Sequence, residues 1–380
     1  MAEEKLSGEQ LKECLALFMS SRKIADKYGV NERTVERKRA KLARQGWSPE
    51  HDMTKTVPDG FHLKGTSTLY GDDGKIKLQW AKTSIDHERQ RELFLMAADS
   101  MASELPQVSK VKGPKATLPH LMAVYPIGDA HIGMRAWGEE TQGDDWDMTE
   151  AVRVQCGAMA ALVDLAPAAD CGVIINLGDW LHADNMQGMT ERSGHVMDLD
   201  GRYAKMIDVG MMVMRQCITS ALKKHKQVRV INVVGNHDDT GALWMSVALR
   251  HTYENEPRVQ IDKAPSAFHY IEHGRCLVGT HHGHTCKAER LPGVMAADQA
   301  EAWGRTRHRY WYLGHVHHQS VKEFAGVTVE SFNTLTAKDA YSAFGGYRAQ
   351  QNMKCIVLHA EFGEVARHTV SPEMLKGVAA

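Results

Sequence analysis

Residues 228–238 read VRVINVVGNHD, an apolar run that passes through a single glycine into three polar side chains. A short run of β-branched residues predicts a buried strand, ending here near Val234. Gly235 permits a sharp turn, after which come Asn236, His237 and Asp238. Because ligands of open α/β sheets bind beyond the carboxyl ends of the strands, this stretch predicts both a sheet and a site at its edge.

Four other strand-like runs end in the same way. Residues 122–127 run into Gly128, Asp129 and His131; 172–177 into Gly178, Asp179 and His182; 276–278 into Gly279, His281, His282 and His284; and 310–313 into Gly314, His315 and His317. One such motif is common by chance. Five of them in one order, each at the end of a predicted strand, indicate a single assembled site.

The spacing of the runs predicts the fold class of residues 119–375. Helices are expected at about 149–165 and 200–224, between the strands at 122–127, 172–177 and 228–234. Alternating strands and helices of this length favour a parallel sheet with helices on its faces, the α/β class. After about residue 258 the pattern changes to strands and hairpins, which predicts a second sheet of mixed or antiparallel strands.

The order DxH, GD, GNHD, a His next to Gly, and GHxH resembles the calcineurin-like metallophosphoesterases over about residues 119–375. The resemblance implies a two-sheet sandwich flanked by helices, with two metal ions at one edge. The implied ligands of the first ion are Asp129, His131 and His317, and those of the second are Asn236, His282 and His315. Asp179 is implied to bridge the ions, and His237 to act beside the scissile phosphate without binding metal.

The residue types suit this chemistry independently. A shared carboxylate can hold two cations close together, and the cations lower the pKa of a water so that hydroxide exists near pH 7. Mixed oxygen and imidazole ligands favour Mn, Fe or Zn over Mg or Ca, and we expect Mn. A His outside the ligand set can protonate the leaving oxygen, and we expect Asp238 to orient His237 as a second catalytic residue.

Some assignments stay open at this level. His281, His282 and His284 compete for one ligand position, and the family habit of a ligand directly before Gly favours His282. His182, Asp184 and Asn185 either support the site from outside the ligands or pack in a loop. Arg192, His195 and Arg202, on the insert that follows Asp179, are either substrate contacts or side chains of a solvated loop, and the solvated loop is favoured.

Residues 1–46 are predicted to be helical and to form a separate domain. Helices are expected at about 7–19, at 21–29 with Gly29 as its stop, and from Asn31 to residue 44. Residues 21–44 resemble a DNA-binding helix-turn-helix, although Lys38 occupies a position that is usually apolar. Residues 21–45 hold nine Lys or Arg against three Asp or Glu, a net charge of +6 in a chain of net charge −1. By analogy with a recognition helix, Arg33, Thr34, Arg37 and Lys41 face DNA. The alternative is a protein-interaction module with a solvated basic face.

Residues 47–118 are expected to connect the two domains. Strand-like runs at 61–70 and 75–82 flank Gly71-Asp72-Asp73-Gly74, which signals a hairpin. A helix is expected at about 86–105, followed by a linker rich in Lys, Pro and Gly.

Composition excludes several classes of protein. Among 380 residues, 43% are apolar and 24% are charged, no run is long and apolar enough for a membrane span, and the start lacks a signal-peptide pattern. The seven cysteines are scattered without CxxC pairs, which is typical of reduced thiols in a cytoplasm. We therefore expect a cytoplasmic protein, in the host cytoplasm if it is phage-encoded.

A phosphodiesterase-type domain joined to a helix-turn-helix suggests that the phosphoester lies in nucleic acid. The leading hypothesis is a two-metal DNA nuclease, and the combination resembles proteins encoded near replication genes in bacteriophages. One alternative is a phosphatase or cyclic-nucleotide phosphodiesterase that uses the helical unit for docking. The other is a DNA-binding regulator whose phosphoesterase domain is inactive, against which the complete ligand set argues.

Overall fold

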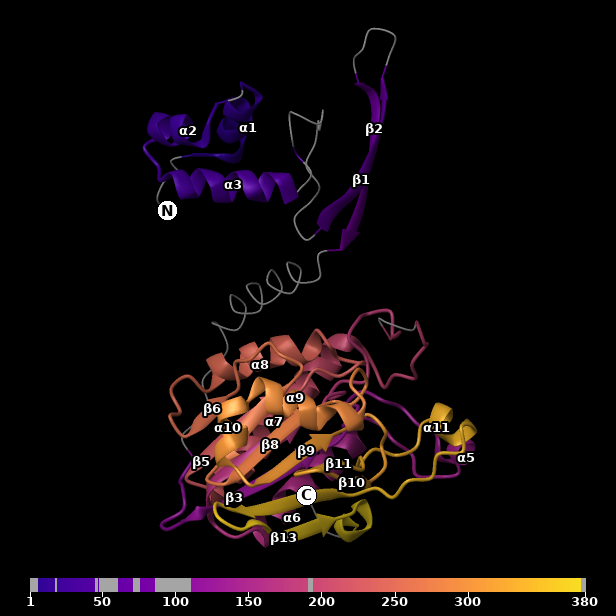
Figure 1. The fold of residues 1–380 in the computed structure, drawn as a ribbon. Helices are drawn as coiled ribbons and strands as arrows, with labels where there is room; N and C mark the ends of the chain where they lie inside the picture. Colours follow the sequence, from indigo (N-terminus) through magenta and orange to yellow (C-terminus); the bar gives the residue numbers. More distant parts are fainter. Residues whose placement is uncertain are drawn as a thin grey trace. The chain divides into compact units, whose positions relative to one another are not determined.

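The computed structural model describes residues 6–17, 19–44, 47, 61–70, 76–85, 111–190 and 194–376. The chain divides into two compact units, Met1–Ala97 and Ala98–Ala380 (Figure 1). The elements predicted on residues 86–105 and the turn at 71–74 lie outside the described residues. Within the described ranges, every helix is too short or too polar to cross a lipid bilayer.

The first unit contains the three predicted helices, α1 Gly8–Ala16, α2 Ser21–Tyr28 and α3 Glu32–Arg44. Ser7 and Gln10 cap α1 reciprocally, and Gly29 ends α2 in the left-handed conformation at φ 61°. Their buried faces form one small core around Leu11, Ile24 and Val35. Lys38, the departure from the expected pattern, donates a hydrogen bond to the carbonyl oxygen of Leu6, which explains how an ammonium group is accommodated there.

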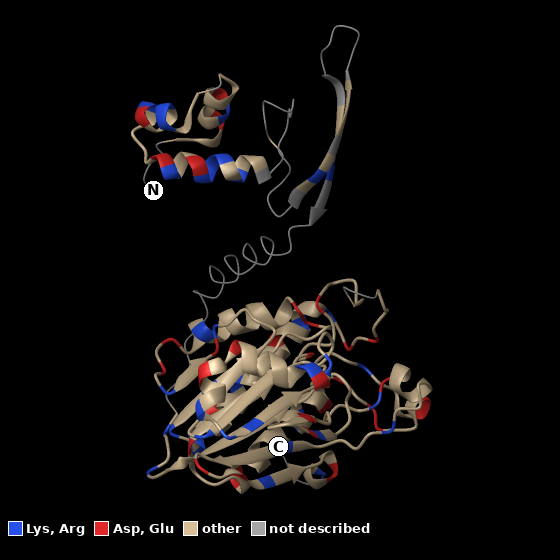
Figure 2. Cartoon of the chain, viewed as in Figure 1, with Lys and Arg blue, Asp and Glu red and all other residues tan. Residues whose placement is uncertain are grey.

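The outer face of α3 is charged. Arg33, Arg37 and Lys41 are exposed, and Thr34 is half-buried. Both acidic residues of α3, Glu32 and Glu36, lie in its first half, and basic residues continue beyond them (Figure 2). The unit also contains the predicted hairpin strands, β1 Phe61–Tyr70 and β2 Ile76–Ile85, which pair antiparallel.

The second unit contains a six-stranded sheet with the order β13-β12-β3-β4-β5-β6. β3, β4, β5 and β6 run parallel, while β12 is antiparallel to β3 and β13 is antiparallel to β12. The strands are β3 Leu118–Ile127, β4 Ala169–Asn176, β5 Gln227–Asn232, β6 Val259–Ile261, β12 Met353–His359 and β13 Gly363–Val370. The parallel strands predicted from the sequence thus form the centre of this sheet.

A five-stranded mixed sheet follows, with the order β10-β11-β9-β8-β7. β8, β9 and β11 are parallel, and β7 and β10 lie antiparallel at its edges. The strands are β7 His269–His273, β8 Cys276–His281, β9 His308–Leu313, β10 Ser320–Phe324 and β11 Val327–Ser331. This is the mixed second sheet expected after residue 258.

Side chains that alternate along each strand separate the layers. On β3, Ala123 and Tyr125 pack against helices, whereas Met122 and Val124 pack against the other sheet. Helices therefore cover the outer face of each sheet (Figure 1). The helices of this unit are α5 Gly138–Thr141, α6 Met148–Leu165, α7 Tyr203–Lys224, α8 Gly241–Thr252, α9 Leu291–Asp298, α10 Ala300–Arg305 and α11 Ala340–Phe344, with the 3-10 turns η2 Ala288–Arg290 and η3 Pro372–Leu375. The predicted two-sheet sandwich flanked by helices is confirmed.

Candidate metal centre

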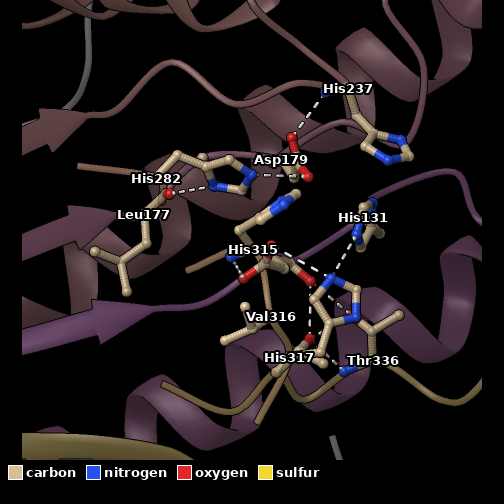
Figure 3. Close-up of polar contacts among 12 residues, drawn as sticks. His131, Leu177, Asp179, His237, His282, His315, Val316, His317 and Thr336 are labelled. Atoms are coloured by element: carbon tan, nitrogen blue, oxygen red, sulfur yellow. Dashed lines mark hydrogen bonds and ion pairs between the residues drawn. The ribbon is translucent and has the colours of Figure 1, made fainter. Parts of the chain in front are cut away.

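The carboxyl ends of β3, β4 and β5 in one sheet and of β8 and β9 in the other meet at one edge of the sandwich. The loops that leave these strands carry all five sequence motifs. Figure 3 shows His131, Asp179, His282, His315 and His317 converging from these loops. Residues from five distant parts of the chain therefore share one site.

The backbone at this edge adopts an unusual conformation. Among the described residues, six that are not glycine have a positive φ, and five of these are predicted ligands: Asp129, His131, Asp179, His315 and His317. Left-handed backbone costs non-glycine residues energy, and it concentrates at functional sites. The site is thus marked by its backbone as well as by its side chains.

The glycines of the motifs allow close approach to the carboxylates. A Cβ atom on Gly235 would lie 2.1 Å from Oδ1 of Asp179, and one on Gly314 would lie 2.7 Å from Oδ2 of Asp129. Because both positions are too tight for any side chain, glycine is required there.

Asp129, His131 and His317 form the first cluster. Nε2 of His317 lies 3.2 Å from Nε2 of His131 and 3.3 Å from Oδ1 of Asp129. Both carboxylate oxygens of Asp129 also accept the backbone N–H of His315, at 2.9 and 3.0 Å, which holds the carboxylate in place.

Asp179, His282 and His315 form the second cluster. Nε2 of His282 lies 3.1 Å from Oδ2 of Asp179 and 3.1 Å from Oδ1 of Asn236. Nδ1 of His282 donates to the carbonyl oxygen of Leu177 at 2.8 Å, so Nε2 is left to accept a metal ion.

These separations fit two metal ions. Two ligand atoms that each lie about 2.0–2.1 Å from one ion are roughly 2.8–3.4 Å apart in octahedral or tetrahedral geometry. The separations within the two clusters, from 3.1 to 3.3 Å, fall in that interval. Two imidazole nitrogens that face each other at 3.2 Å suit a shared cation, because at most one of them can donate a proton to the other.

The electrostatics of the site also favour a bound metal cation. Burial opposes protonation of His282, but the carboxylate of Asp179 outweighs it and raises the pKa of His282 to about 10. Burial and the imidazoles of His237 and His182 lower the pKa of His131 well below its usual range. The carboxylate of Asp179 thus attracts positive charge, while His131, crowded by other imidazoles, resists carrying a proton. A divalent cation satisfies both.

His237 lies beside the clusters, but its partners differ from the prediction. Its backbone N–H donates to Oδ1 of Asp179 at 2.8 Å, and its Nδ1 donates to the carbonyl oxygen of His182 at 3.0 Å. The predicted role of Asp238 in orienting His237 is therefore not what the structure shows: a backbone carbonyl orients the ring.

Asp238 instead holds the loop that carries Asp179. Its Oδ1 accepts the backbone N–H of Asp179 at 3.0 Å and of Gly235 at 3.3 Å. Its Oδ2 accepts those of Trp180 at 2.7 Å and Leu181 at 3.2 Å. Both oxygens of this fully buried carboxyl are thereby used for backbone donors. Asp238 is a positioning residue.

The loop after Asp179 has two different parts. His182, left open by the sequence, lies within the site: its Nδ1 is 3.1 Å from Nδ1 of His131, and the two form a third potential ligand group with His237. Asp184 is structural, since it accepts the backbone N–H of Thr240 at 2.6 Å before α8. Asn185 is also structural, because its Oδ1 accepts the backbone N–H of Gln187 at 3.0 Å within the loop.

Of the three histidines after β8, the structure places His282 in the second cluster and the other two outside it. The ring of His281 stacks on Phe268, and its Nε2 lies 3.1 Å from Oγ1 of Thr285, outside both clusters. His282 is the member of the second cluster. His284 lies beside it, with ring centroids 5.2 Å apart, as expected for a residue that lines the site.

Two threonines support the site without any motif in the sequence to reveal them. The hydroxyls of Thr334 and Thr336 donate to the carbonyl oxygen of Asp129 at 2.8 and 3.0 Å. They stabilise the strained turn from the segment between β11 and α11. Of the candidate substrate contacts, His195 and Arg202 are exposed and belong to neither cluster, and Arg192 lies outside the described residues.

Comparison with known proteins adds little to this geometry. No family model matches the chain, and no curated protein matches it. Solved structures that are similar include Vps29 from Entamoeba histolytica in complex with zinc (13% identity over 66% of this chain and 98% of that chain, TM-score 0.27). Others are an archaeal phosphodiesterase (11%, 66% and 99%, TM-score 0.30) and the phosphopantetheinyl hydrolase PptH from Mycobacterium tuberculosis (9%, 57% and 91%, TM-score 0.25). Likenesses of this size establish neither a family nor an activity, so the function must follow from the site itself.

Proposed function

We propose that this protein is a phosphodiester hydrolase that acts on nucleic acid and depends on two divalent transition-metal ions, with Mn²⁺ as the expected metal. The observation that carries the proposal is the assembly of Asp, His and Asn side chains at the carboxyl ends of strands from both sheets, on strained backbone.

The two clusters define which residues hold the ions. Asp129, His131 and His317 would bind the first ion, and His282, His315 and Asn236 the second, with Asp179 contributing to both. Bound there, the ions would supply positive charge to a phosphoryl oxygen. They would also lower the pKa of a water molecule, so that hydroxide would be available near pH 7 to attack phosphorus. Imidazole and carboxylate ligands together favour transition ions over Mg²⁺ or Ca²⁺.

His237 is the group of the chain that can move a proton. Because its Nδ1–H donates to the carbonyl of His182, its Nε2 is the atom available to carry a proton. Its backbone N–H also donates to Oδ1 of Asp179, so His237 both positions a metal ligand and carries the imidazole that can transfer a proton. A partly exposed imidazole in this position can protonate the oxygen that leaves phosphorus.

The N-terminal unit supports nucleic acid as the substrate class. Arg33, Arg37 and Lys41 project from one exposed helix within a segment of net charge +6. Such a face attracts a phosphate backbone, whichever bases that backbone carries. We propose that α3 contacts DNA, with Thr34 beside these three residues, and that the activity is that of a nuclease of the phage type.

The test is a substrate panel with purified protein and Mn²⁺. It contains labelled single- and double-stranded DNA, RNA, cyclic nucleotides and a phosphomonoester, and Asp179→Asn is the matched variant. We expect cleavage of nucleic acid by the wild type, two bound ions per chain by elemental analysis, and loss of both ions and activity in the variant. Hydrolysis confined to cyclic nucleotides or monoesters would replace the nuclease by the alternative enzyme. Absence of bound metal and of all hydrolysis would favour an inactive regulator.

A further inference from the structure

Three large aromatic side chains crowd an exposed segment at the carboxyl end of the second sheet. Tyr341, Phe344 and Tyr347 lie on or directly after α11, and 71%, 83% and 59% of their surfaces are exposed. We call these three residues the aromatic platform. Leaving so much aromatic surface in water forgoes the free energy of burial, and contiguous exposed apolar surface usually marks a binding site.

The platform adjoins the metal centre through a cavity. A cavity of about 250 Å³ has His317, Thr336, Lys338, Tyr347 and Arg348 among its lining residues. His317 belongs to the first cluster, and Thr336 holds the backbone of Asp129. One continuous hollow therefore leads from the metal ligands to an aromatic ring of the platform.

The platform is held in shape by specific contacts. Asp339 caps α11 by accepting the backbone N–H of Ser342 at 2.8 Å. The guanidinium of Arg348 donates to the carbonyl oxygens of Ala343 at 3.3 Å and Tyr347 at 2.9 Å. The rings of Tyr341 and Tyr347 stack with centroids 6.2 Å apart and planes 28° apart. These contacts reduce the entropy that the segment would lose on binding a ligand.

A close approach at Gly345 adds to this arrangement. A Cβ atom at that position would meet the ring of Tyr347 at 2.6 Å. Because Gly345 has no side chain, the ring of Tyr347 can pack directly against the backbone at Gly345, and this contact restricts where the ring can lie.

Basic residues outnumber acidic ones in the lining of this cavity, which suits a polyanion. Lys338 and Arg348 line the cavity with His317 and Tyr347, and Asp144 is the acidic residue in the lining. Lys338 donates to the carbonyl oxygen of Gln142 at 2.9 Å, which keeps its ammonium group near the cavity. Exposed rings next to cations form the combination that binds single-stranded nucleic acid, because bases stack on the rings while the cations attract the phosphates.

We propose that the aromatic platform stacks the bases of single-stranded nucleic acid and so delivers the adjoining phosphodiester to the metal centre. This inference rests on the proposed function and adds a substrate class, since bases in a duplex are already stacked on each other. A DNA that carries both a duplex and a single-stranded end offers each unit of the protein its own ligand.

Matched oligonucleotides test the proposal in the full-length protein. One is a single strand with all its bases, and the other has the same length with abasic sites around the cleaved bond. We expect a lower KM for the strand with bases, and Tyr347→Ala should raise that KM by roughly 5- to 150-fold, the range for one stacked base. The KM for the abasic strand should stay within about 2-fold. Tyr347→Phe should keep the wild-type KM because it retains the ring.

A second measurement follows stacking directly. A single strand that contains 2-aminopurine is titrated with metal-free protein, so that no cleavage occurs. Stacking should quench its fluorescence, and Tyr341→Ala with Tyr347→Ala should remove the quenching. Phe362→Ala is the control, because this ring is 67% exposed but lies far from the metal centre. It belongs to the turn after β12, and the last residue of β12, His359, pairs with Leu121 near the start of β3. The metal centre lies at the opposite, carboxyl end of β3.

The outcomes separate this inference from the function on which it rests. Wild-type cleavage of nucleic acid with equal KM for normal and abasic strands would overturn the platform and leave the nuclease standing. Equal quenching by the wild type and the double variant would overturn it as well. Failure of the wild type to cleave any nucleic acid would instead overturn the proposed function.

Discussion

Replacing Asp238 by Asn tests whether this buried carboxyl holds the metal centre together. The change keeps the size of the side chain and exchanges one acceptor oxygen for an NH₂ donor. In the wild type, Oδ1 and Oδ2 each accept two backbone N–H groups. Whichever way the amide turns, its NH₂ group faces two backbone donors that then have no acceptor.

The expected cost follows from that count. A buried donor without a partner costs about 1–3 kcal/mol, so two of them cost roughly 2–6 kcal/mol. The upper part of this range is a large fraction of the 5–15 kcal/mol that stabilises a typical protein. In one orientation the released donors include the backbone N–H of Asp179, whose φ of 54° is strained, and in the other they are those of Trp180 and Leu181, which follow it directly. In either case the carboxylate of Asp179 should shift and metal affinity should fall.

Two measurements separate these effects. Hydrogen–deuterium exchange of a peptide that covers residues 179–182, in metal-free protein, reports the loss of the backbone hydrogen bonds. Metal titration then reports the affinity. Asp239→Asn is the control, because it removes the same charge one residue away, where the carboxylate accepts from the Thr240 hydroxyl.

Burial and the nearby carboxyls of Asp179 and Asp184 raise the pKa of Asp238 well above its usual range. If Asp238→Asn matched the control in exchange and affinity, the carboxyl would already carry a proton, and the acceptor-only role would be refuted.

Three further predictions concern other parts of the molecule. His237→Ala should retain both ions yet lower turnover of a phosphodiester by roughly 10²–10⁴-fold; wild-type turnover with full metal content would remove His237 from proton transfer. Arg37→Ala with Lys41→Ala should reduce the slope of log affinity for duplex DNA against log salt by about two units at most; an unchanged slope would mean that α3 does not contact phosphates. Burial lowers the pKa of His225 to about 4, from about 6.5 when unfolded. The unfolded chain therefore binds the extra proton, and the free energy of unfolding should fall by about 2 kcal/mol between pH 7 and pH 5. His225→Gln should flatten that decline in urea denaturation curves, and an equally steep decline would show that another group is responsible.

Local patterns in the sequence were sufficient for the scaffold. The run at 122–127 predicts a buried strand, and because successive side chains of a strand point to opposite faces, Met122 and Val124 face one core while Ala123 and Tyr125 face the other. Each motif follows an apolar run, and parallel strands end at the same edge of a sheet. The convergence of Asp129, Asp179 and His282 could thus be anticipated without knowing any distance. Their roles as ligands stay a prediction until metal is measured.

Other features depended on pairing between distant segments. Asp238 follows His237 directly, which suggested that it orients that ring, yet its carboxyl points to donors about 58 residues earlier in the chain. Likewise, Thr334 and Thr336 reach Asp129 across more than 200 residues, because β11 pairs with β9 and so returns the chain to this edge.

The sequence by itself therefore determined which residue types stand at the strand ends and how the strands alternate between layers, because both depend on neighbours in the chain. Only the tertiary structure decided which donors each buried carboxyl accepts, that His282 and not His281 joins the second cluster, and that the exposed ring of Tyr347 borders the same cavity as His317. The physical reason is that buried polar groups must find partners wherever packing places them. The packing of two sheets brings together residues that no local pattern relates.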